Sequence, residues 1–355
     1  MLPSDRVIKS NAQRFRACTD PAVPLPTNPA CMMRFSRLLV PLRLGWGTWA
    51  AVAGAMAPAG AVAQGAPPAS PAVLAAPVPS SPTDSAALRR QRLRWLVGGS
   101  AVGYGVIYTG LTTAWYTGEK APLHWFDDWP EWKQLDKAGH FWGAFQESRG
   151  AVDMLRWAGL SERKALWYGA LAGFAIQSPL ELLDGRDPAY GASASDLAAN
   201  FLGSSALLAQ QLAWREVRIM PKWSFHLTSY AQRRPNVLGS SVPERWLKDY
   251  NGQTYWLCTD VGAFLKPGNR WPRWLQPAVG YGGEDLVYND DGVNAAQGLR
   301  PYRQYYLSLD VDLRHIPTRS KLLKRVFYTL SIFHLPAPAL EYSGRNGFRF
   351  HGLYQ

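Results

Sequence analysis

The stretch between residues 136 and 203 constrains the fold most, because it places ionisable side chains inside apolar segments with helical spacing. A buried ionisable group costs free energy unless it is paired or used, so these side chains must be gathered rather than scattered. Three pairs lie three or four residues apart, which puts both members on one face of a helix. The pairs are Asp136 with His140, Glu181 with Asp184, and Asp196 with Asn200. We therefore expect three inward helix faces to form one cluster of carboxylates, an imidazole and an amide.

The spacing of apolar residues and the residues at the segment ends predict three helices in this stretch. Their expected ranges are 136–155, 161–184 and 194–219. Pro179 should kink the second helix, Gly185 suits the position after it, and Ser193 begins a sequence that fits a capping box for the third. Ahead of them, residues 95–118 carry no charge and are long enough to span a bilayer. A helix buried in a membrane-attached bundle explains that segment equally well, so both interpretations stay open.

The clustered side chains have a structural interpretation. Asp136 can serve as an N-cap, Asp196 can complete a capping box, and Asn200 can form a hydrogen bond between helices. Glu181 and Asp184 are harder to explain in this way, because they lie at the C-terminal end of a helix, where the macrodipole disfavours negative charge. These two carboxylates need a nearby cation, a shared proton or a metal ion.

The same side chains also have a functional interpretation. The candidate metal ligands are Asp136, His140, Glu181, Asp184 and Asp196. An oxygen-rich site with one imidazole favours Mg²⁺, Mn²⁺ or Ca²⁺ over a closed zinc site. Either His140 or Glu181 would act as the catalytic acid or base. The supporting groups would be Lys137, Arg186 and Asn200. In this interpretation a divalent cation would be the cofactor, and the sequence alone leaves the cofactor unknown.

The first part of the chain resembles an export signal followed by a tether. A start at Met32 or Met33 gives a basic segment, a short apolar segment and an Ala-Val-Ala cleavage site, which together make a secretory signal peptide. We therefore assign residues 1–63 to an upstream segment and signal peptide. Residues 64–88 form a tether rich in Pro and Ala. No cysteine lies at the cleavage site, where Gln64 follows Ala63, so nothing there predicts attachment of a lipid.

The net charge and the tryptophan content indicate which class of partner to expect. Removal of residues 1–63 leaves 31 basic and 24 acidic side chains, a net charge of +7. A moderately basic exported protein fits an anionic membrane surface, and the chain's 16 Trp fit the headgroup region, which indoles prefer. No nucleic-acid-binding module is recognisable, so we expect no nucleic-acid partner. The expected partner is a membrane lipid or another envelope component, and a protein partner is compatible with the same composition.

Three motifs together resemble a known family. They are Asp136-Lys137-x-x-His140-Phe141, Glu181-x-x-Asp184-x-Arg186 and Ser193-x-x-Asp196-x-x-x-Asn200-x-x-Gly203. Residues 130–215 are similar to the YfiM-like predicted periplasmic lipoproteins, a domain of unknown function, and more distantly to VanZ-like membrane proteins. Longer members of the first family share sequence with residues 250–256 and 307–312. The resemblance implies an exported bacterial envelope protein with a helical core, located in the periplasm and attached to the inner or outer membrane. It implies no reaction.

After residue 220 the pattern changes from helices to strands. Polar and apolar residues alternate over residues 305–313, which is typical of a strand with one buried face. Further strand candidates are residues 255–265, 276–281, 337–342 and 348–354. The last two flank a turn sequence that predicts a hairpin. Residues 320–334 have the pattern of an amphipathic helix, either an ordinary surface helix or one that lies at a membrane interface.

The expected fold class is therefore α+β. A hydrophobic bundle of about four helices should occupy residues 89–220 and carry the polar motifs. An antiparallel sheet with one amphipathic helix should occupy residues 221–355.

Two functions from different classes remain. The expected one is that of a membrane-associated envelope protein in which the buried cluster holds the bundle together or serves an interaction. The alternative is an enzyme or ligand-binding protein that works at the membrane on a lipid-linked or envelope substrate, with a divalent metal ion in the cluster. The first predicts that substitutions in the cluster destabilise the fold, whereas the second predicts folded but inactive variants.

Overall fold

The computed structural model describes residues 82–114, 120–188 and 191–354, and the statements below concern these residues. They all belong to one compact unit. The expected upstream segment and signal peptide, residues 1–63, lie outside the described part, and so do residues 64–81 of the expected tether. The rest of that tether belongs to a helix, because α3 begins at Pro82.

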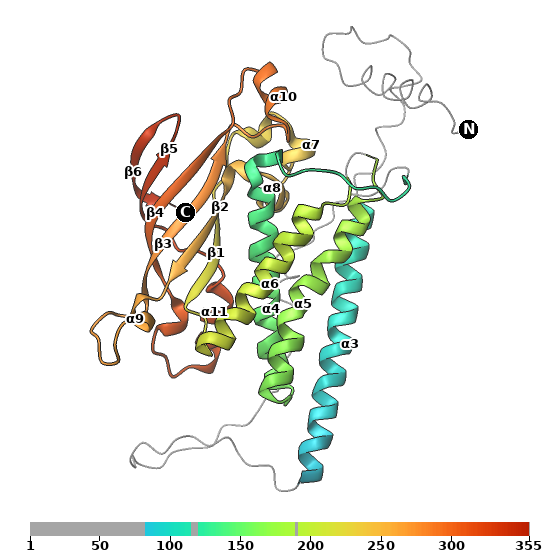
Figure 1. Cartoon of the computed structure of the whole chain (residues 1–355), viewed down its shortest axis with the longest axis vertical. Coiled ribbons are helices and arrows are strands. Elements are labelled where there is room, and N and C mark those ends of the chain that lie inside the picture. Colours follow the sequence, from blue (N-terminus) through green and yellow to red (C-terminus); the bar gives the residue numbers. More distant parts are fainter. Residues whose placement is uncertain (1–81, 115–119, 189–190, 355) are drawn as a thin grey trace. The chain divides into compact units, whose positions relative to one another are not determined.

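Three long helices pack together in the first half of this unit (Figure 1). They are α4 (Leu135–Trp157), α5 (Glu162–Asp184) and α6 (Ala194–Trp214). Their apolar core includes Phe145, Val152, Leu166 and Leu207. Gly203 of α6 is required for this packing, because a Cβ there would overlap the carbonyl oxygen of Phe141 on α4. The close approach brings the polar residues of the three helices within reach of one another.

Helix α3 (Pro82–Ala114) is only loosely joined to these three. Arg92 donates to the carbonyl oxygen of Trp157 at 2.9 Å, and Tyr104 donates to that of Ile176 at 3.3 Å. The side chain of Trp95 is exposed. The expected hydrophobic four-helix bundle is therefore not confirmed. No helix in the described part combines the length and the apolar character needed to cross a membrane.

The second half is built on a six-stranded antiparallel sheet, which confirms the α+β class. The strands are β1 (Ile219–Phe225), β2 (Gln253–Thr259), β3 (Leu275–Glu284), β4 (Tyr302–Val311), β5 (Ala337–Ser343) and β6 (Gly347–Tyr354). Their order in the sheet is their order in the chain. The connections contain the short helices α7 (Pro235–Leu238), α8 (Val242–Lys248), α9 (Val261–Phe264) and α10 (Asp291–Ala296), and the 3₁₀ turns η2 (Tyr230–Gln232), η3 (Tyr250–Gly252) and η4 (Leu313–His315). A further 3₁₀ turn, η1 (Glu131–Gln134), comes directly before α4.

The expected third helix ends earlier than predicted, at Trp214, and β1 begins at Ile219, where the helix was expected to end. Arg215 adopts a left-handed conformation with φ of 58°, which stops the helix. Gln210 then binds the incoming strand: its Oε1 accepts from the amides of Arg218 at 3.0 Å and Ile219 at 2.8 Å. A side chain of the helix therefore supplies hydrogen bonds that fix the start of β1.

The expected amphipathic helix is present as α11 (Lys321–Leu330), with Ser320 as its N-cap. It stops before His334 because the following residues pair with β1. The amide of Trp223 donates to the carbonyl oxygen of Ile332 at 3.1 Å, and the amide of His334 donates to that of Trp223 at 2.9 Å. This segment covers part of the free edge of β1.

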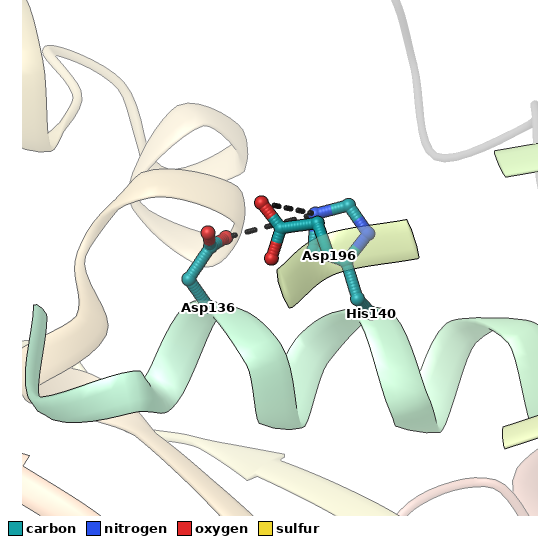
Figure 2. A group of neighbouring side chains, drawn as sticks. All are labelled: Asp136, His140 and Asp196. Atoms are coloured by element: carbon teal, nitrogen blue, oxygen red, sulfur yellow. Dashed lines mark ion pairs between the residues drawn. The ribbon is translucent and has the colours of Figure 1, made fainter. Parts of the chain in front are cut away.

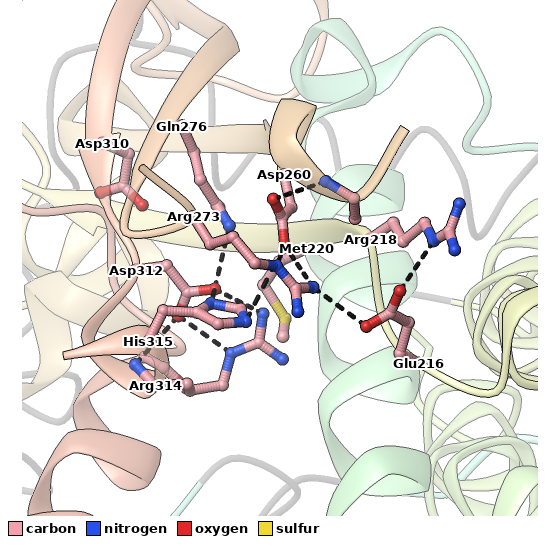
Figure 3. A network of polar contacts seen from close by, with 12 residues as sticks. Glu216, Arg218, Met220, Asp260, Arg273, Gln276, Asp310, Asp312, Arg314 and His315 are labelled. Atoms are coloured by element: carbon pink, nitrogen blue, oxygen red, sulfur yellow. Dashed lines mark hydrogen bonds and ion pairs between the residues drawn. The ribbon is translucent and has the colours of Figure 1, made fainter. Parts of the chain in front are cut away.

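Ion pairs stabilise the end of the sheet that contains the C-terminal ends of β2 and β4 (Figure 3). Asp260 and Asp312 are fully buried there. Arg273 lies 2.6 Å from Asp260 Oδ2, and Arg314 lies 2.7 Å from Asp312 Oδ2. His315 Nδ1 is 2.9 Å from the same Asp312 oxygen. These buried acids are thus neutralised by neighbours on the same loops.

Helix α4 rests on the sheet and connects it to the polar cluster. The rings of Trp142 and Trp223 lie 5.8 Å apart across this contact. Gly139 faces the ring of Tyr255, where a Cβ would come within 2.8 Å of the phenol oxygen. The sheet and its connections therefore close one side of the cluster.

Candidate functional site

The three long helices bring most of the predicted site residues together. Asp136 and His140 point from α4 toward Asp196 on α6 (Figure 2). Glu181 approaches from the last turn of α5, and Asn200 lies one turn after Asp196. The spacing of four residues within α4 and within α6 puts each pair on one helix face, as the helical period requires.

His140 is the centre of the cluster. Its Nδ1 donates to Asn200 Oδ1 at 3.0 Å, which leaves Nε2 as the nitrogen that faces the carboxylates. Nε2 lies 3.8 Å from Asp136 Oδ1, 3.9 Å from Glu181 Oε1 and 3.9 Å from Asp196 Oδ2. These distances are too long for direct hydrogen bonds. Three carboxylates therefore surround one nitrogen without any of them binding it.

Lys137 contacts the oxygens of Asp136 and Asp196 that face away from His140. Its Nζ donates to Asp128 Oδ2 at 2.5 Å and to Asp136 Oδ2 at 3.1 Å, and it lies 2.9 Å from Asp196 Oδ1. Asp136 and Asp196 therefore use one oxygen for the ammonium group and turn the other toward His140. Such outer partners fix the orientation of inner ligands.

Glu181 contributes the least satisfied atom of the cluster. Its side chain is almost fully buried, and Oε2 accepts from the amide of Ser193 at 3.1 Å. Oε1, the atom that faces His140, is buried and has no hydrogen-bond partner among the described residues. A buried carboxylate oxygen without a partner costs free energy, which makes this atom a candidate ligand.

The capping box expected at α6 is only half present. Ser193 Oγ accepts from the amide of Asp196 at 3.0 Å, as predicted. The amide of Ser193, however, donates to Glu181 rather than to Asp196. The reason is that the carboxylate of Asp196 lies between Lys137 and His140 and does not reach back to the cap.

Burial and mutual charge shift the protonation of the cluster. Burial raises the pKa of Glu181 to about 7. Burial, together with repulsion from Asp136, also raises the pKa of Asp196. Burial opposes the charged form of His140, but the three surrounding carboxylates outweigh it and raise its pKa. At neutral pH the cluster therefore holds protons that a divalent cation would replace.

Two predicted residues lie apart from this centre. Asp184 is half-buried on α5 and is not among the three carboxylates within 4 Å of His140. Arg186 is exposed and forms no ion pair with the cluster within the described ranges. Its carbonyl oxygen instead accepts from the amide of Ala121. Gly185, next to it, has φ of −61°, so it serves close packing against Leu123 rather than a left-handed turn.

Two residues of the cluster, Asp128 and Tyr250, were not predicted from the sequence. Asp128 Oδ1 accepts from Ser193 Oγ at 2.6 Å and from Ser195 Oγ at 2.7 Å. Burial opposes its ionisation, but hydrogen bonds from Lys137 and these serines lower the pKa of Asp128 to about 2. Tyr250 donates to Asp136 Oδ1 at 2.7 Å. Asp128 precedes the helices and Tyr250 follows them, so helical spacing could not reveal either one.

Beside the cluster is a cavity of about 290 Å³ with an apolar lining. It is lined by Leu123, Trp125, Ala175, Ser178, Pro179, Glu181, Leu182, Ala192 and Leu197. Glu181 is the one ionisable side chain among these lining residues. The cavity therefore places an apolar volume next to a carboxylate of the cluster.

Residues 124–210 match the model of a family described as "Predicted periplasmic lipoprotein (DUF2279)". The matched segment contains α4, α5, most of α6 and every predicted site residue. The match supports the family resemblance of the motifs, while the finer likeness to YfiM-like and VanZ-like proteins stays a prediction. No curated protein and no solved structure matches the chain.

Proposed function

We propose that the protein is an exported, membrane-attached protein of the bacterial cell envelope whose helices bind one divalent metal ion. The ligands would be Asp136, His140, Glu181 and Asp196. The description of the matched family as periplasmic lipoproteins supports the location, together with the signal peptide expected in residues 1–63. The metal site rests on one observation: three carboxylate oxygens lie 3.8 to 3.9 Å from His140 Nε2, and none is hydrogen-bonded to it.

These separations have the size that a shared ion requires. Ligand atoms held at about 2.1 Å from one ion lie about 3 to 4 Å from one another. Asp136, His140 and Asp196 each offer one ligand atom, and these atoms all lie within 4.8 Å of one another. An ion at their centre would also satisfy the orphaned Oε1 of Glu181.

The surrounding contacts prepare the ligands for a cation. Asn200 accepts the hydrogen of Nδ1, which leaves the lone pair of Nε2 for the ion once its proton has left. Lys137 holds the oxygen of Asp136 that faces away from His140, and Tyr250 donates to Oδ1, the oxygen that would bind the ion. Three carboxylates and one imidazole fit Mg²⁺, Mn²⁺ or Ca²⁺ better than a closed structural zinc site.

The test is titration calorimetry, in which the full chain is titrated with Mg²⁺, Mn²⁺ or Ca²⁺. We expect one ion per chain in the wild type and at least about 100-fold weaker binding in Asp196→Asn, because an amide supplies no charge to the ion. Asp184→Asn is the matched control, since Asp184 lies outside the centre, and it should bind like the wild type.

The structural alternative makes the opposite prediction. If the cluster only joins α4, α5 and α6, neither the wild type nor Asp184→Asn will bind an ion, and His140→Gln will melt well below the wild type without any metal present. That result would overturn the metal site and leave the cluster as internal scaffolding.

A second candidate function is an enzyme or binding protein for a lipid-linked envelope substrate. The apolar cavity beside Glu181 favours it, because such a volume accepts part of an acyl chain next to a potential acid or base. Leu182→Trp should fill the cavity and abolish uptake of a fluorescent lipid while metal binding stays unchanged. Unchanged lipid uptake by this variant would remove the support for this candidate.

A further inference from the structure

One row of exposed apolar side chains crosses the sheet in register. It consists of Leu257, Val279, Leu307, Leu340 and Phe350, each directly paired with the next across neighbouring strands. Their exposed fractions run from 40% to 73%. Leu309, Tyr305 and Phe348 lie on the same face, two residues from the row, and are also exposed. The result is a continuous apolar surface over β2 to β6.

The opposite face of the sheet is buried and mixes apolar with polar side chains, since Trp256, Cys258, Ala278, Tyr306 and Ala339 form a core cluster there. Ser308, Asp310 and Glu341 point into it, and Asp310 lies 2.5 Å from the ammonium group of Lys222 with both side chains fully buried. An antiparallel sheet with one face in water usually carries polar residues on that face. This sheet instead exposes apolar side chains on its outer face, at a cost in free energy that a covering partner would remove.

One end of this surface is basic. The register places the end of β2, the start of β3 and the end of β4 together, so α9 and α11 lie at that end (Figure 1). The exposed cations there are Lys266, Arg270, Arg319, Lys321, Lys324 and Arg325. They form no ion pair with another described residue, because the buried acids of this end are already neutralised by Arg273 and Arg314 (Figure 3).

Aromatic residues border the apolar row. Trp271 and Trp274 are exposed next to the start of β3, at the basic end. Tyr305 and Tyr342 are paired with each other and lie on the other side of the row. Indole and phenol groups prefer the boundary between acyl chains and headgroups. An apolar centre, aromatic borders and a basic end thus occur on one surface.

We propose that this surface docks on a membrane that contains anionic phospholipids. The charge favours lipid over a second copy of the chain, because the exposed cations attract an anionic surface, whereas a second copy would bring a further net charge of +12. The docking is interfacial: β6 is an edge strand, and its unpaired backbone groups require water. The inference deepens the proposed envelope location, on which it rests for the class of partner, and it does not depend on the metal site.

The test is flotation of the full chain with vesicles of phosphatidylglycerol and phosphatidylethanolamine, compared with vesicles of phosphatidylcholine. The wild type should bind the anionic vesicles more tightly. Val279→Glu combined with Leu307→Glu should weaken binding at least about 10-fold, because charge is costly on a lipid-facing sheet. The matched control, Leu227→Glu combined with Leu247→Glu, changes two equally exposed leucines elsewhere and should bind like the wild type.

The basic end is tested separately. Changing Lys321, Lys324 and Arg325 to Gln should weaken binding to anionic vesicles about 100-fold and remove most of its salt dependence. All variants carry the same residues 1–81, so any contribution of that segment cancels. Circular dichroism verifies that each variant is folded.

Two outcomes would overturn the proposal. One is equal binding of the Glu variant and the wild type to anionic vesicles. The other is a wild-type dimer in light scattering that the Glu variant converts to a monomer, which would assign the surface to a second copy. Asp196→Asn should float like the wild type, so a failure of the metal site and a failure of the membrane surface give different results.

Discussion

Replacing Glu147 by Gln should stabilise the protein at pH 8 and leave its stability at pH 4 almost unchanged. Glu147 lies on α4, and its Oε2 is buried without a hydrogen-bond partner among the described residues. Burial raises the pKa of this carboxyl to about 8, against an ordinary value of 4.5. The folded protein therefore keeps the proton at neutral pH, whereas the unfolded chain releases it.

The sign and size follow from linkage. Because the folded pKa is raised, the stabilisation is fully present below pH 4.5 and is lost as the pH rises toward 8. At about 1.4 kcal/mol for each pH unit, the loss over that window reaches about 5 kcal/mol. Gln has nearly the shape of a protonated Glu and does not titrate. The free energy of unfolding of the variant therefore does not fall over this pH range.

The assay is urea unfolding of both proteins at pH 4 and pH 8. We expect Glu147→Gln to exceed the wild type by about 3 to 5 kcal/mol at pH 8 and to differ by less than about 1 kcal/mol at pH 4. A stability difference that is the same at both pH values would refute the reasoning, because it would show that the carboxyl does not change its protonation on folding.

Three further predictions concern the packing and the sheet. Lys222→Met should lower the free energy of unfolding by about 3 to 5 kcal/mol, since it leaves Asp310 buried and unpaired, and adding Asp310→Leu should restore most of it in denaturant titrations. Gly203→Ala should push α6 from Phe141, cost about 1 to 3 kcal/mol in thermal melts and weaken metal binding. Burial lowers the pKa of His334 to about 4, so its contribution to stability should be lost as the pH falls from 6.5 toward 4, and imidazole proton resonances will report that pKa.

The elements that could be predicted from the sequence are those with one buried and one exposed face. Alternation in residues 305–313 predicted β4 because one face is buried and the other exposed. The first strand escaped prediction because β1 is buried on both faces from Met220 to Ser224, which removes the period of two. The early end of α6 depends on the side chain of Gln210 reaching the next strand, a contact that no local pattern encodes.

In the cluster, too, local spacing predicted some residues and missed others. Asp136, His140 and Asp196 were found because helical spacing puts them on inward faces. Asp184 shares the spacing of Glu181 but is not near the imidazole, since two residues three positions apart on one helix need not reach the same point in space. Asp128 enters the cluster from a connecting segment, and only the folded chain brings it to Lys137.

The most direct test of the metal site is electron spin echo spectroscopy of the full chain loaded with one equivalent of Mn²⁺. The site predicts modulation from a directly bound nitrogen, present in the wild type and in Asp184→Asn and absent in His140→Gln. A wild-type spectrum with only water and carboxylate ligands would contradict it, because His140 Nε2 is the atom around which the three carboxylates are arranged.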